Sequence, residues 1–144
     1  MAIAGIEIGQ NEQRKLFSKL DQVKINIPNM VYDGLVKFLF TAKMNAQNKI
    51  KADRHIVTSR LRNSIFVKSH SKFKDNVNYS DNEGGRFNAD LDVDLKPHEA
   101  AFGTNVEYAE KIERLDSFIW WGFKNADNRE FSKEYNRQIN KVVK

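Results

Sequence analysis

The chain has 144 residues, of which 40% are hydrophobic and 30% charged, and its formal net charge is +5. This length suits one compact domain with a modest core, so we expect a single domain over residues 1–144. The lack of cysteine excludes a disulfide framework, a thiolate zinc site and a cysteine nucleophile. Apolar runs such as that at residues 38–40 fall far short of the roughly 20 residues of a membrane helix. We therefore expect no membrane partner and no signal peptide.

The first third of the chain predicts an extended piece and two helices. Residues 1–8, in which isoleucines recur among small residues, predict a short strand or an extended arm. Apolar residues recur at helical spacing over 11–23, where Asn11 is placed to cap a short amphipathic helix. Pro28 should separate this helix from a second one of about 20 residues over 31–50, in which an apolar stripe recurs every three or four positions.

Beyond residue 54 the apolar period changes to two, which predicts strands with one buried face. We expect these strands at 65–67, 73–79 and 87–95, with a hairpin turn over 80–86 and Pro97 ending the third strand. A fourth extended piece over 100–106, a helical turn over 108–113 and a C-terminal helix over 127–143 should follow. The fold class is therefore α+β, with a long N-terminal helix and a C-terminal helix packed on a mostly antiparallel β-sheet.

Three aspartates invite a metal hypothesis. Asp90, Asp92 and Asp94 stand at alternate positions, as carboxylates do at the start of a calcium loop. That loop also needs Gly at position 95 and Glu at position 101, where this chain has Leu95 and Ala101. Three interpretations stay open: a solvated strand face, a weak cation site, and a row of carboxylates that meets a basic neighbouring subunit.

Nothing in the sequence indicates catalysis. The three histidines, His55, His70 and His98, form no pair with metal-ligand spacing. A nucleophile elbow, a phosphate-binding glycine loop and a dinucleotide fingerprint are also missing. We predict that the chain is not an enzyme and has no catalytic residue, metal or cofactor. The rival hypothesis is a small nuclease that uses the three aspartates and a histidine around a metal.

A basic stretch runs from Lys43 to Lys74, with nine Lys or Arg residues against one Asp. Such a stretch can be a solvated face, can bind an acidic protein rim, or can attract a phosphate backbone without reading its sequence. The candidates to face DNA are Lys49, Lys51, Arg54 and Arg60. A non-sequence-specific nucleic-acid-binding protein is therefore the alternative function.

Four large apolar rings stand within six residues, at Phe118, Trp120, Trp121 and Phe123. They cannot all face one small core. One interpretation is that they close the end of the sheet beneath the last helix, and the other is that one or both tryptophans form a subunit interface.

Two segments carry a family resemblance: Val-Thr-Ser-Arg-Leu-Arg-Asn-Ser-Ile at 57–65 and Phe-Gly-Thr-Asn-Val-Glu-Tyr-Ala-Glu-Lys-Ile-Glu at 102–113. The first resembles Thr-Gly-x-Leu-Arg-x-Ser-Ile and the second Gly-Thr-x-x-x-Tyr-Ala-x-x-x-Glu, both typical of the head-tail joining (tail-completion, neck) family of long-tailed bacteriophages. A weaker match is the aromatic segment followed by Lys-Asn-Ala at 124–126. The chain departs from the family at Ser59, where the family usually has Gly, and at Arg114, where the family tends to have Gly directly after its Glu. It also lacks an Ala-Pro pair before Val57.

The resemblance implies a structural virion protein of the neck or tail, assembled in the cytoplasm of a bacterial host. Its partners would be further copies in a homo-oligomeric ring and the portal, adaptor or tail proteins, with genome DNA passing through the channel. The implied fold-signature or interface residues are Thr58, Leu61, Arg62, Ser64, Gly103, Tyr108, Glu113, Trp120 and Trp121. In this view Thr58 and Ser59 turn the chain out of the long helix, and period two places Leu61 and Ile65 in the core with Arg60 and Arg62 outside.

Overall fold

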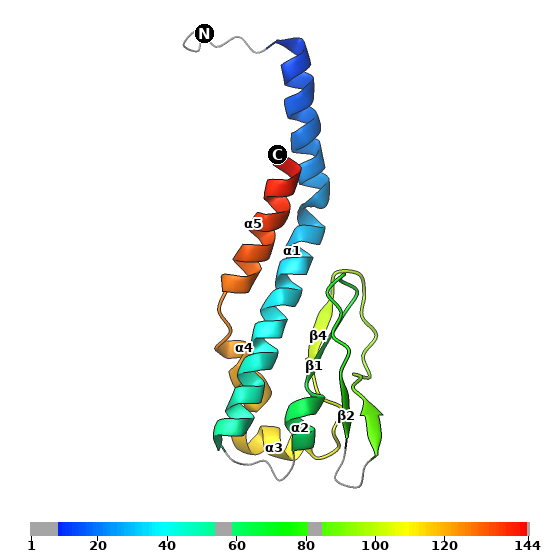
Figure 1. Cartoon of the computed structure of the whole chain (residues 1–144), viewed down its shortest axis with the longest axis vertical. Coiled ribbons are helices and arrows are strands. Elements are labelled where there is room, and N and C mark those ends of the chain that lie inside the picture. The colour runs from blue at the N-terminus through cyan, green and yellow to red at the C-terminus, as the bar shows by residue number, and fades with distance from the viewer. Residues whose placement is uncertain (1–8, 54–58, 81–84, 144) are drawn as a thin grey trace.

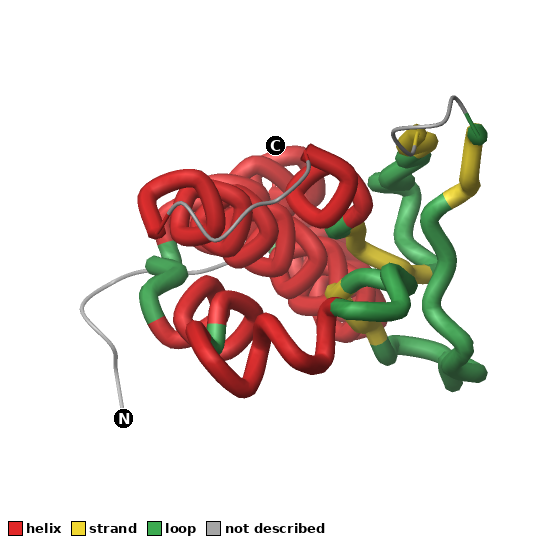
Figure 2. The backbone as a smooth tube through the Cα atoms, turned by 90° about the horizontal axis from the view of Figure 1, so that it is seen from below, coloured by secondary structure: helices red, strands yellow, loops and turns green. Residues whose placement is uncertain are grey.

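A single long helix is the spine of the molecule. The computed structural model describes residues 9–53, 59–80 and 85–143. Helix α1 (Gln10–Asp53) runs the length of the molecule, and the other elements lie along it (Figure 1). Helices α4 (Phe118–Lys124) and α5 (Arg129–Val143) pack against one side of α1, whereas the strands lie on the other side (Figure 2). This arrangement confirms the predicted α+β class.

The strands form two small antiparallel sheets. One sheet pairs β1 (Phe66–Ser69) with β4 (Ala100–Gly103), and the other pairs β2 (Asn78–Ser80) with β3 (Arg86–Asn88). The β1–β4 sheet contacts α1 directly. Four pieces of strand were expected and four are present among the described residues; β1 is one residue longer than expected, whereas β2, β3 and β4 are shorter than the apolar alternation predicts.

The predicted strand over 87–95 is wrong beyond Asn88, because residues 89–99 form a loop. Side chains of Lys68 in β1 and of His70, the residue after β1, contact carbonyl groups of this loop. The Lys68 ammonium donates to the carbonyl oxygen of Leu91 at 2.8 Å and to that of Val93 at 3.0 Å. Nε2 of the His70 ring lies 2.9 Å from the carbonyl oxygen of Leu95. Polar groups that a neighbouring strand would have paired are thereby satisfied by side chains.

The expected break at Pro28 is also wrong, since α1 is continuous through it. Proline removes one hydrogen bond, to the carbonyl of Lys24, but both residues are exposed, so water can bind that carbonyl. Helix α5 contacts α1 on both sides of the proline. The Lys19 ammonium donates to the Val143 carbonyl, and Phe131 packs on Gly34. Packing by α5 therefore joins the two predicted helices into one.

The cap of helix α1 lies two residues before the predicted one. The Gly9 carbonyl accepts the first helical bond, from Gln13, and the Glu12 carboxylate accepts from the Gly9 amide at 3.3 Å. Gly9 thus stands in the cap position with a glutamate three residues later, which is one half of a capping box. The prediction of Asn11 as the cap is wrong. The extended piece predicted for residues 1–8 lies outside the described residues.

The described residues contain three short helices, of which one, near 108–113, was expected. Residues Ser59–Ser64 form helix α2, so the period-two interpretation of this segment is wrong. Leu61 of α2 and Ile65, the residue after it, are both buried nonetheless. The helical turn expected around 108–113 is α3 (Ala109–Asp116), and the aromatic segment is α4. The C-terminal helix was predicted within two residues of α5.

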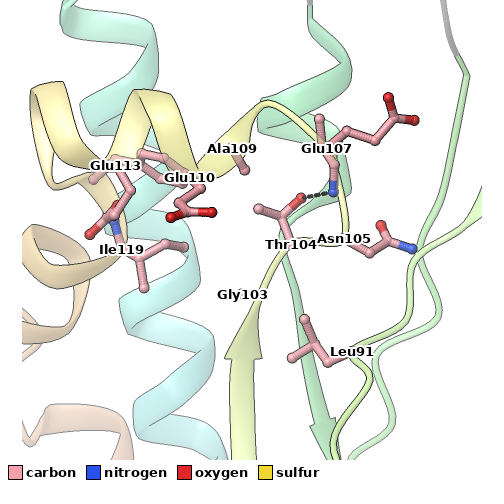
Figure 3. Close-up of a pocket in the computed structure, with 11 residues that line it drawn as sticks. Leu91, Gly103, Thr104, Asn105, Glu107, Ala109, Glu110, Glu113 and Ile119 are labelled. Carbon is pink, nitrogen blue, oxygen red and sulfur yellow. Dashed lines mark hydrogen bonds between the residues drawn. The ribbon is translucent and has the colours of Figure 1, made fainter.

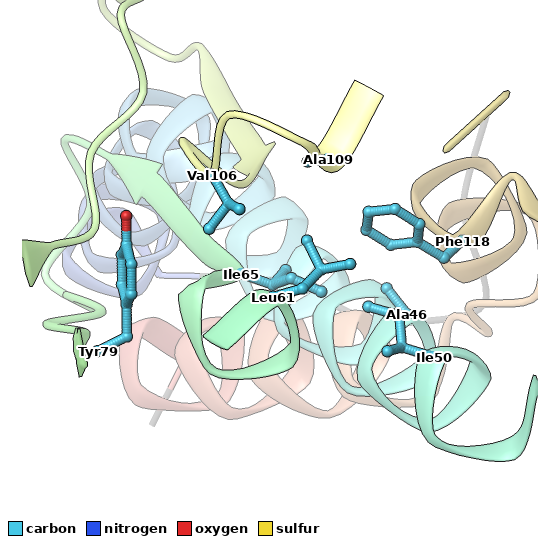
Figure 4. Packing of buried hydrophobic residues seen from close by; sticks show 8 residues of the cluster. All are labelled: Ala46, Ile50, Leu61, Ile65, Tyr79, Val106, Ala109 and Phe118. Carbon is cyan, nitrogen blue, oxygen red and sulfur yellow. The ribbon is translucent and has the colours of Figure 1, made fainter. Parts of the chain in front are cut away.

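The core lies in two clusters along α1. The larger one joins four helices and the connection between β4 and α3 (Figure 4). Its fully buried members include Ala46 of α1, Leu61 of α2 and Phe118 of α4. The second cluster lies between α1 and the β1–β4 sheet and includes Val36, Leu39 and Val67. Helix α1 contributes to both clusters, which makes it the common wall of the fold.

A buried polar cluster fastens α5 to α1. The Gln138 amide donates to Asp33 of α1 at 2.9 Å and to Glu134 at 2.8 Å. Ser71, from the segment after β1, donates to the other Asp33 oxygen at 2.8 Å. Glu134 also accepts two hydrogen bonds from Arg137, at 2.5 and 3.0 Å. The donors to these two carboxylates thus come from α5 and from the segment after β1.

The Arg137 hydrogen bonds, with help from Gln138 and Lys72, lower the pKa of Glu134 from 4.5 to about 2 against the opposing effect of burial. A carboxyl group whose pKa is lower in the folded state stabilises that state above its unfolded pKa, and this contribution is lost as pH falls toward 2. We predict that Glu134→Gln flattens the loss of unfolding free energy between pH 5 and pH 2, measured by urea titration. Ser132→Ala, at an exposed position of the same helix, should keep the wild-type slope. Equal slopes for Glu134→Gln and wild type would contradict this assignment.

Helix α4 crosses α1 so closely that only glycine fits at position 122. A Cβ there would lie 2.6 Å from the Ala42 carbonyl oxygen and 2.9 Å from the Ala46 amide nitrogen. At Gly34 the nearest atoms, at 2.8 and 2.9 Å, belong instead to the Phe131 ring. Backbone cannot move aside as a half-buried side chain can.

We therefore predict that Gly122→Ala lowers the free energy of unfolding by about 1–3 kcal/mol, although alanine in a helix is intrinsically favoured by about 1 kcal/mol. Gly34→Ala is the matched control, because it carries the same helix preference against a movable neighbour. Urea unfolding should show a clearly smaller loss for Gly34→Ala, and a stabilised Gly122→Ala protein would refute the close crossing.

Candidate functional site

Residues of the two signature segments meet at one end of α1. Ser64, at the end of α2, is fully buried, and its hydroxyl donates to the Leu61 carbonyl at 2.8 Å. Because that proton is used, the Thr104 hydroxyl donates to Ser64, at an oxygen–oxygen distance of 2.5 Å. Thr104 in turn accepts from the Val106 amide (Figure 3 shows Thr104 at this junction). A chain of hydrogen bonds therefore links two segments that are 40 residues apart in sequence.

Apolar side chains of the same two segments pack together beside these hydrogen bonds. Leu61 and Ile65 meet Val106 and Phe118 in the larger core cluster (Figure 4). All four have at most 4% of their surface exposed. The first signature segment thus supplies both a buried hydroxyl and buried apolar side chains. Arg62 of this segment is half-buried, and its carbonyl accepts from Gln47 of α1 at 3.0 Å. Thr58 lies outside the described residues.

Glu113 sets the corner between α3 and α4. Its carboxylate accepts from the amide of Ile119 at 2.8 Å and from that of Trp120 at 3.2 Å. Both amides belong to the first turn of α4, where a carboxylate satisfies otherwise unpaired donors. Ser117 stands between the helices with a φ of 51°, a left-handed conformation that lets the chain change direction. Glu113 therefore fixes the direction in which α4 carries its rings.

Gly103 and Tyr108 flank the junction. Gly103 is buried opposite Phe66 in the β1–β4 sheet, and a Cβ there would lie 3.4 Å from the Leu91 side chain. Tyr108 is half-buried, and its ring lies 6.0 Å from the Arg60 guanidinium. Both positions thus contribute packing at the junction.

Arg60 is enclosed by aromatic rings. Its guanidinium lies 4.9 Å from the Phe87 ring and 5.7 Å from the Tyr79 ring, and its side chain is 17% exposed. The Glu107 carboxylate is 3.7 Å away. The arginine named above as a DNA-facing candidate therefore binds the β2–β3 sheet to α2 through cation–π contacts.

A hollow of about 440 Å³ opens beside this junction (Figure 3). Its floor is apolar, with Leu91, Val106 and Ile119, and the carboxylates of Glu107, Glu110 and Glu113 stand around it. Each carboxylate has a partner: Glu107 has Arg60, Glu110 has Arg114 at 2.6 Å, and Glu113 has the amides of α4. The acidic groups around the hollow thus serve structural contacts.

Exposed rings form an apolar strip that continues from α4 onto α1. Phe118 is fully buried, whereas Trp120 is 59% exposed, Trp121 38% and Phe123 44%. Phe123 stacks on Trp120 at 6.5 Å and meets Phe38 of α1 edge-on at 5.6 Å. Leu35, one turn before Phe38, and Val31, one turn before Leu35, extend the strip along α1. Leu35 is 37% exposed and Val31 is 42% exposed. The four rings are therefore divided: Phe118 lies in the core, and Trp120, Trp121 and Phe123 are exposed.

The basic stretch is largely engaged within the chain. Lys43 bonds both oxygens of Asp75, at 2.8 and 3.0 Å, and Lys68 binds the loop after β3. Lys72 lies 3.9 Å from both Asp33 and Glu134, and Lys74 donates to the Ser69 carbonyl. Lys49 of α1 lies 5.6 Å from the Trp121 ring. Lys51 is in α1 without a described side chain, and Arg54 lies outside the described residues.

His70 and His98 line a hollow beside Tyr32, and none of the three aspartates singled out above lines it. His55 lies outside the described residues. Asp90, Asp92 and Asp94 are exposed on the loop after β3 rather than on a strand. Across residues 9–53, 59–80 and 85–143, no three His, Asp or Glu side chains are grouped so that they could hold a metal ion. Within those ranges, no helix is both long and apolar enough to cross a membrane.

Comparisons with protein-family models, with curated proteins and with solved structures find no match for this chain. Function is therefore inferred from the geometry of this site and from the two signature segments.

Sequence reasoning singled out Ser64 but missed its partner Thr104, and it missed the capping role of Glu113. Thr104 lies inside the second signature segment, so its place there was the available signal. The sequence prediction also missed that the apolar strip continues onto α1, because exposed and buried apolar residues of α1 alternate within one helical pattern.

We predict that Ser64→Ala and Thr104→Val each lower the free energy of unfolding by about 1–3 kcal/mol, since each leaves a buried polar group without its partner. The double variant should lose less than the sum of the two by about 0.5 kcal/mol or more, because the residues share one network. Ser132→Ala, at an exposed position of α5, should stay within about 0.5 kcal/mol of wild type. Strict additivity of the two buried changes in urea unfolding would argue against the link.

Proposed function

We propose that the chain is a structural virion protein of a tailed bacteriophage, forming part of the neck, head-tail connector or tail-completion ring during assembly. The observation that carries the proposal is the meeting of both signature segments in one hydrogen-bonded junction, with Glu113 of the second segment directing α4 and its exposed rings. These residues build a scaffold and present a surface, which is the work of an assembly protein.

The apolar strip supports a subunit contact. Contiguous exposed apolar surface is uncommon on a protein that acts alone, and tryptophan is enriched among residues that dominate interfaces. In a ring, this surface of each copy would contact a different surface of the neighbouring copy, so the contact is heterologous. The rotation that relates neighbouring copies then closes the ring. Trp120 and Trp121 are the interface residues on this proposal, and Phe123, Leu35 and Val31 extend it.

Nucleic-acid binding by the basic stretch has no comparable support, because Lys43, Lys68 and Lys72 are engaged with acidic groups or carbonyls of the same chain. A neck protein needs only to surround a channel through which DNA passes. The proposed role is non-enzymatic.

The decisive experiment is electron microscopy of particles from the parent phage with this gene disabled and a copy supplied in trans. Without the gene, we expect filled heads and separate finished tails that do not join. The wild-type copy should restore joined particles, and Trp120→Ala or Trp121→Ala should reduce their yield about tenfold or more, because a central aromatic contact is worth about 2 kcal/mol or more.

Val93→Ala is the matched control, since Val93 is a 46% exposed apolar residue outside the strip. It should restore joined particles like wild type. Circular dichroism of the purified tryptophan variants should show wild-type helix content, which separates a lost contact from a lost fold. Intact, infectious virions without the gene would refute the proposed function.

A further inference from the structure

The first turns of α1 project beyond the rest of the molecule (Figure 1). Helix α5 ends where the Lys19 ammonium lies 3.3 Å from the Val143 carbonyl oxygen, so the residues of α1 before Lys19 extend past its end. Three large apolar side chains stand in this region: Leu16 is 45% exposed, Phe17 60% and Leu20 53%. A helical end with this composition is unusual for a surface that faces only water.

These residues continue the seam that α5 covers farther along α1. Leu16, Leu20, Ile27, Met30 and Gly34 follow the a and d spacing of a heptad repeat. Met30 is 1% exposed and Gly34 is buried against Phe131, whereas Ile27 is 36% exposed. One apolar stripe is thus covered by α5 around Met30 and Gly34 and exposed at Leu16 and Leu20, in its N-terminal part. The uncovered part has the shape of a site for a second helix.

The charges beside the stripe decide which helix fits. Lys15 and Lys19 border it on one side and Lys24 on the other, and all three are exposed. In a parallel pair of identical helices, Lys19 at a g position would face Lys24 of the second copy at an e position. Two such lysine pairs would form, one on each side of the contact. An antiparallel pair would likewise bring lysine to lysine. Like charges at these positions oppose pairing, so a second copy of this chain is disfavoured here.

We propose that this end of α1 is a docking site for an amphipathic helix of another protein, with an apolar stripe that covers Leu16 and Leu20 and acidic side chains that meet Lys19 and Lys24. The contact lies along Gln10–Leu20 of α1, about 16 Å of helix, and continues the α1–α5 seam. It is independent of the ring proposal, because it uses a different part of α1 from Trp120 and the apolar strip.

The test uses the full-length protein and two labelled synthetic peptides of about three heptads, both with Leu at a and d and Ala elsewhere. One peptide has Glu at e and g, and the other has Lys there. Fluorescence anisotropy should show the Glu peptide binding and the Lys peptide binding at least about tenfold more weakly. Leu16→Ala/Leu20→Ala should weaken the Glu peptide about tenfold or more, a loss of about 1.4 kcal/mol. Lys19→Glu/Lys24→Glu should reverse the preference between the peptides.

Ile25→Ala is the matched control, because Ile25 is 74% exposed on the opposite side of the same helix and should not affect binding. Alanine favours helix at least as well as leucine, so circular dichroism should show helix content unchanged in the Leu16/Leu20 variant. Three results would each overturn the proposal: no binding of the Glu peptide, self-association that depends on Leu16 and Leu20, or binding that appears only after residues 2–8 are removed.

Discussion

The packing of other elements onto α1 is the constraint on which the structure depends. This helix of 44 residues, about 66 Å long, contributes to both core clusters and contacts α2, α4, α5 and the β1–β4 sheet directly. Its continuity through Pro28 is held by α5, which contacts it on both sides of the proline. The buried cluster of Asp33, Glu134 and Gln138 then fixes α5 at one register, since each carboxylate would be costly to bury without its donors.

Close approach at a single point sets the position of α4. Gly122 lies against the backbone of α1 at Ala42, and Glu113 holds the first turn of α4 from the other end. Between these two restraints, Phe118 enters the core while Trp120 and Phe123 face outward. The exposed rings are thus rigidly placed. Preorganisation of this kind reduces the entropy lost on binding, which suits a subunit contact that forms during assembly.

Helix α1 thus contributes to two apolar surfaces of different character. The strip over α4 and the middle of α1 is aromatic and is placed by the signature residues, so it fits the proposed ring contact. The stripe near the beginning of α1 is aliphatic and bordered by lysines, so it fits an acidic helix of another protein. A joining protein must bind both its own copies and unlike neighbours, and the separation of the two surfaces would allow both contacts at once.

The sequence by itself determined the α+β class, the position of the C-terminal helix and the apolar stripe of α1, because hydrophobic period follows directly from helix and strand geometry. It also singled out Leu61, Ser64, Glu113 and the tryptophans through the two signature segments. Tertiary structure decided what depends on contacts between distant residues. Packing by α5 overrode the break predicted at Pro28, and Lys68 and His70 turned an alternating segment into a loop. Contact with Thr104 gave Ser64 its partner, and burial of Phe118 beneath α2 separated it from the exposed rings. Each of these outcomes depends on groups far apart in the chain, which local spacing does not encode.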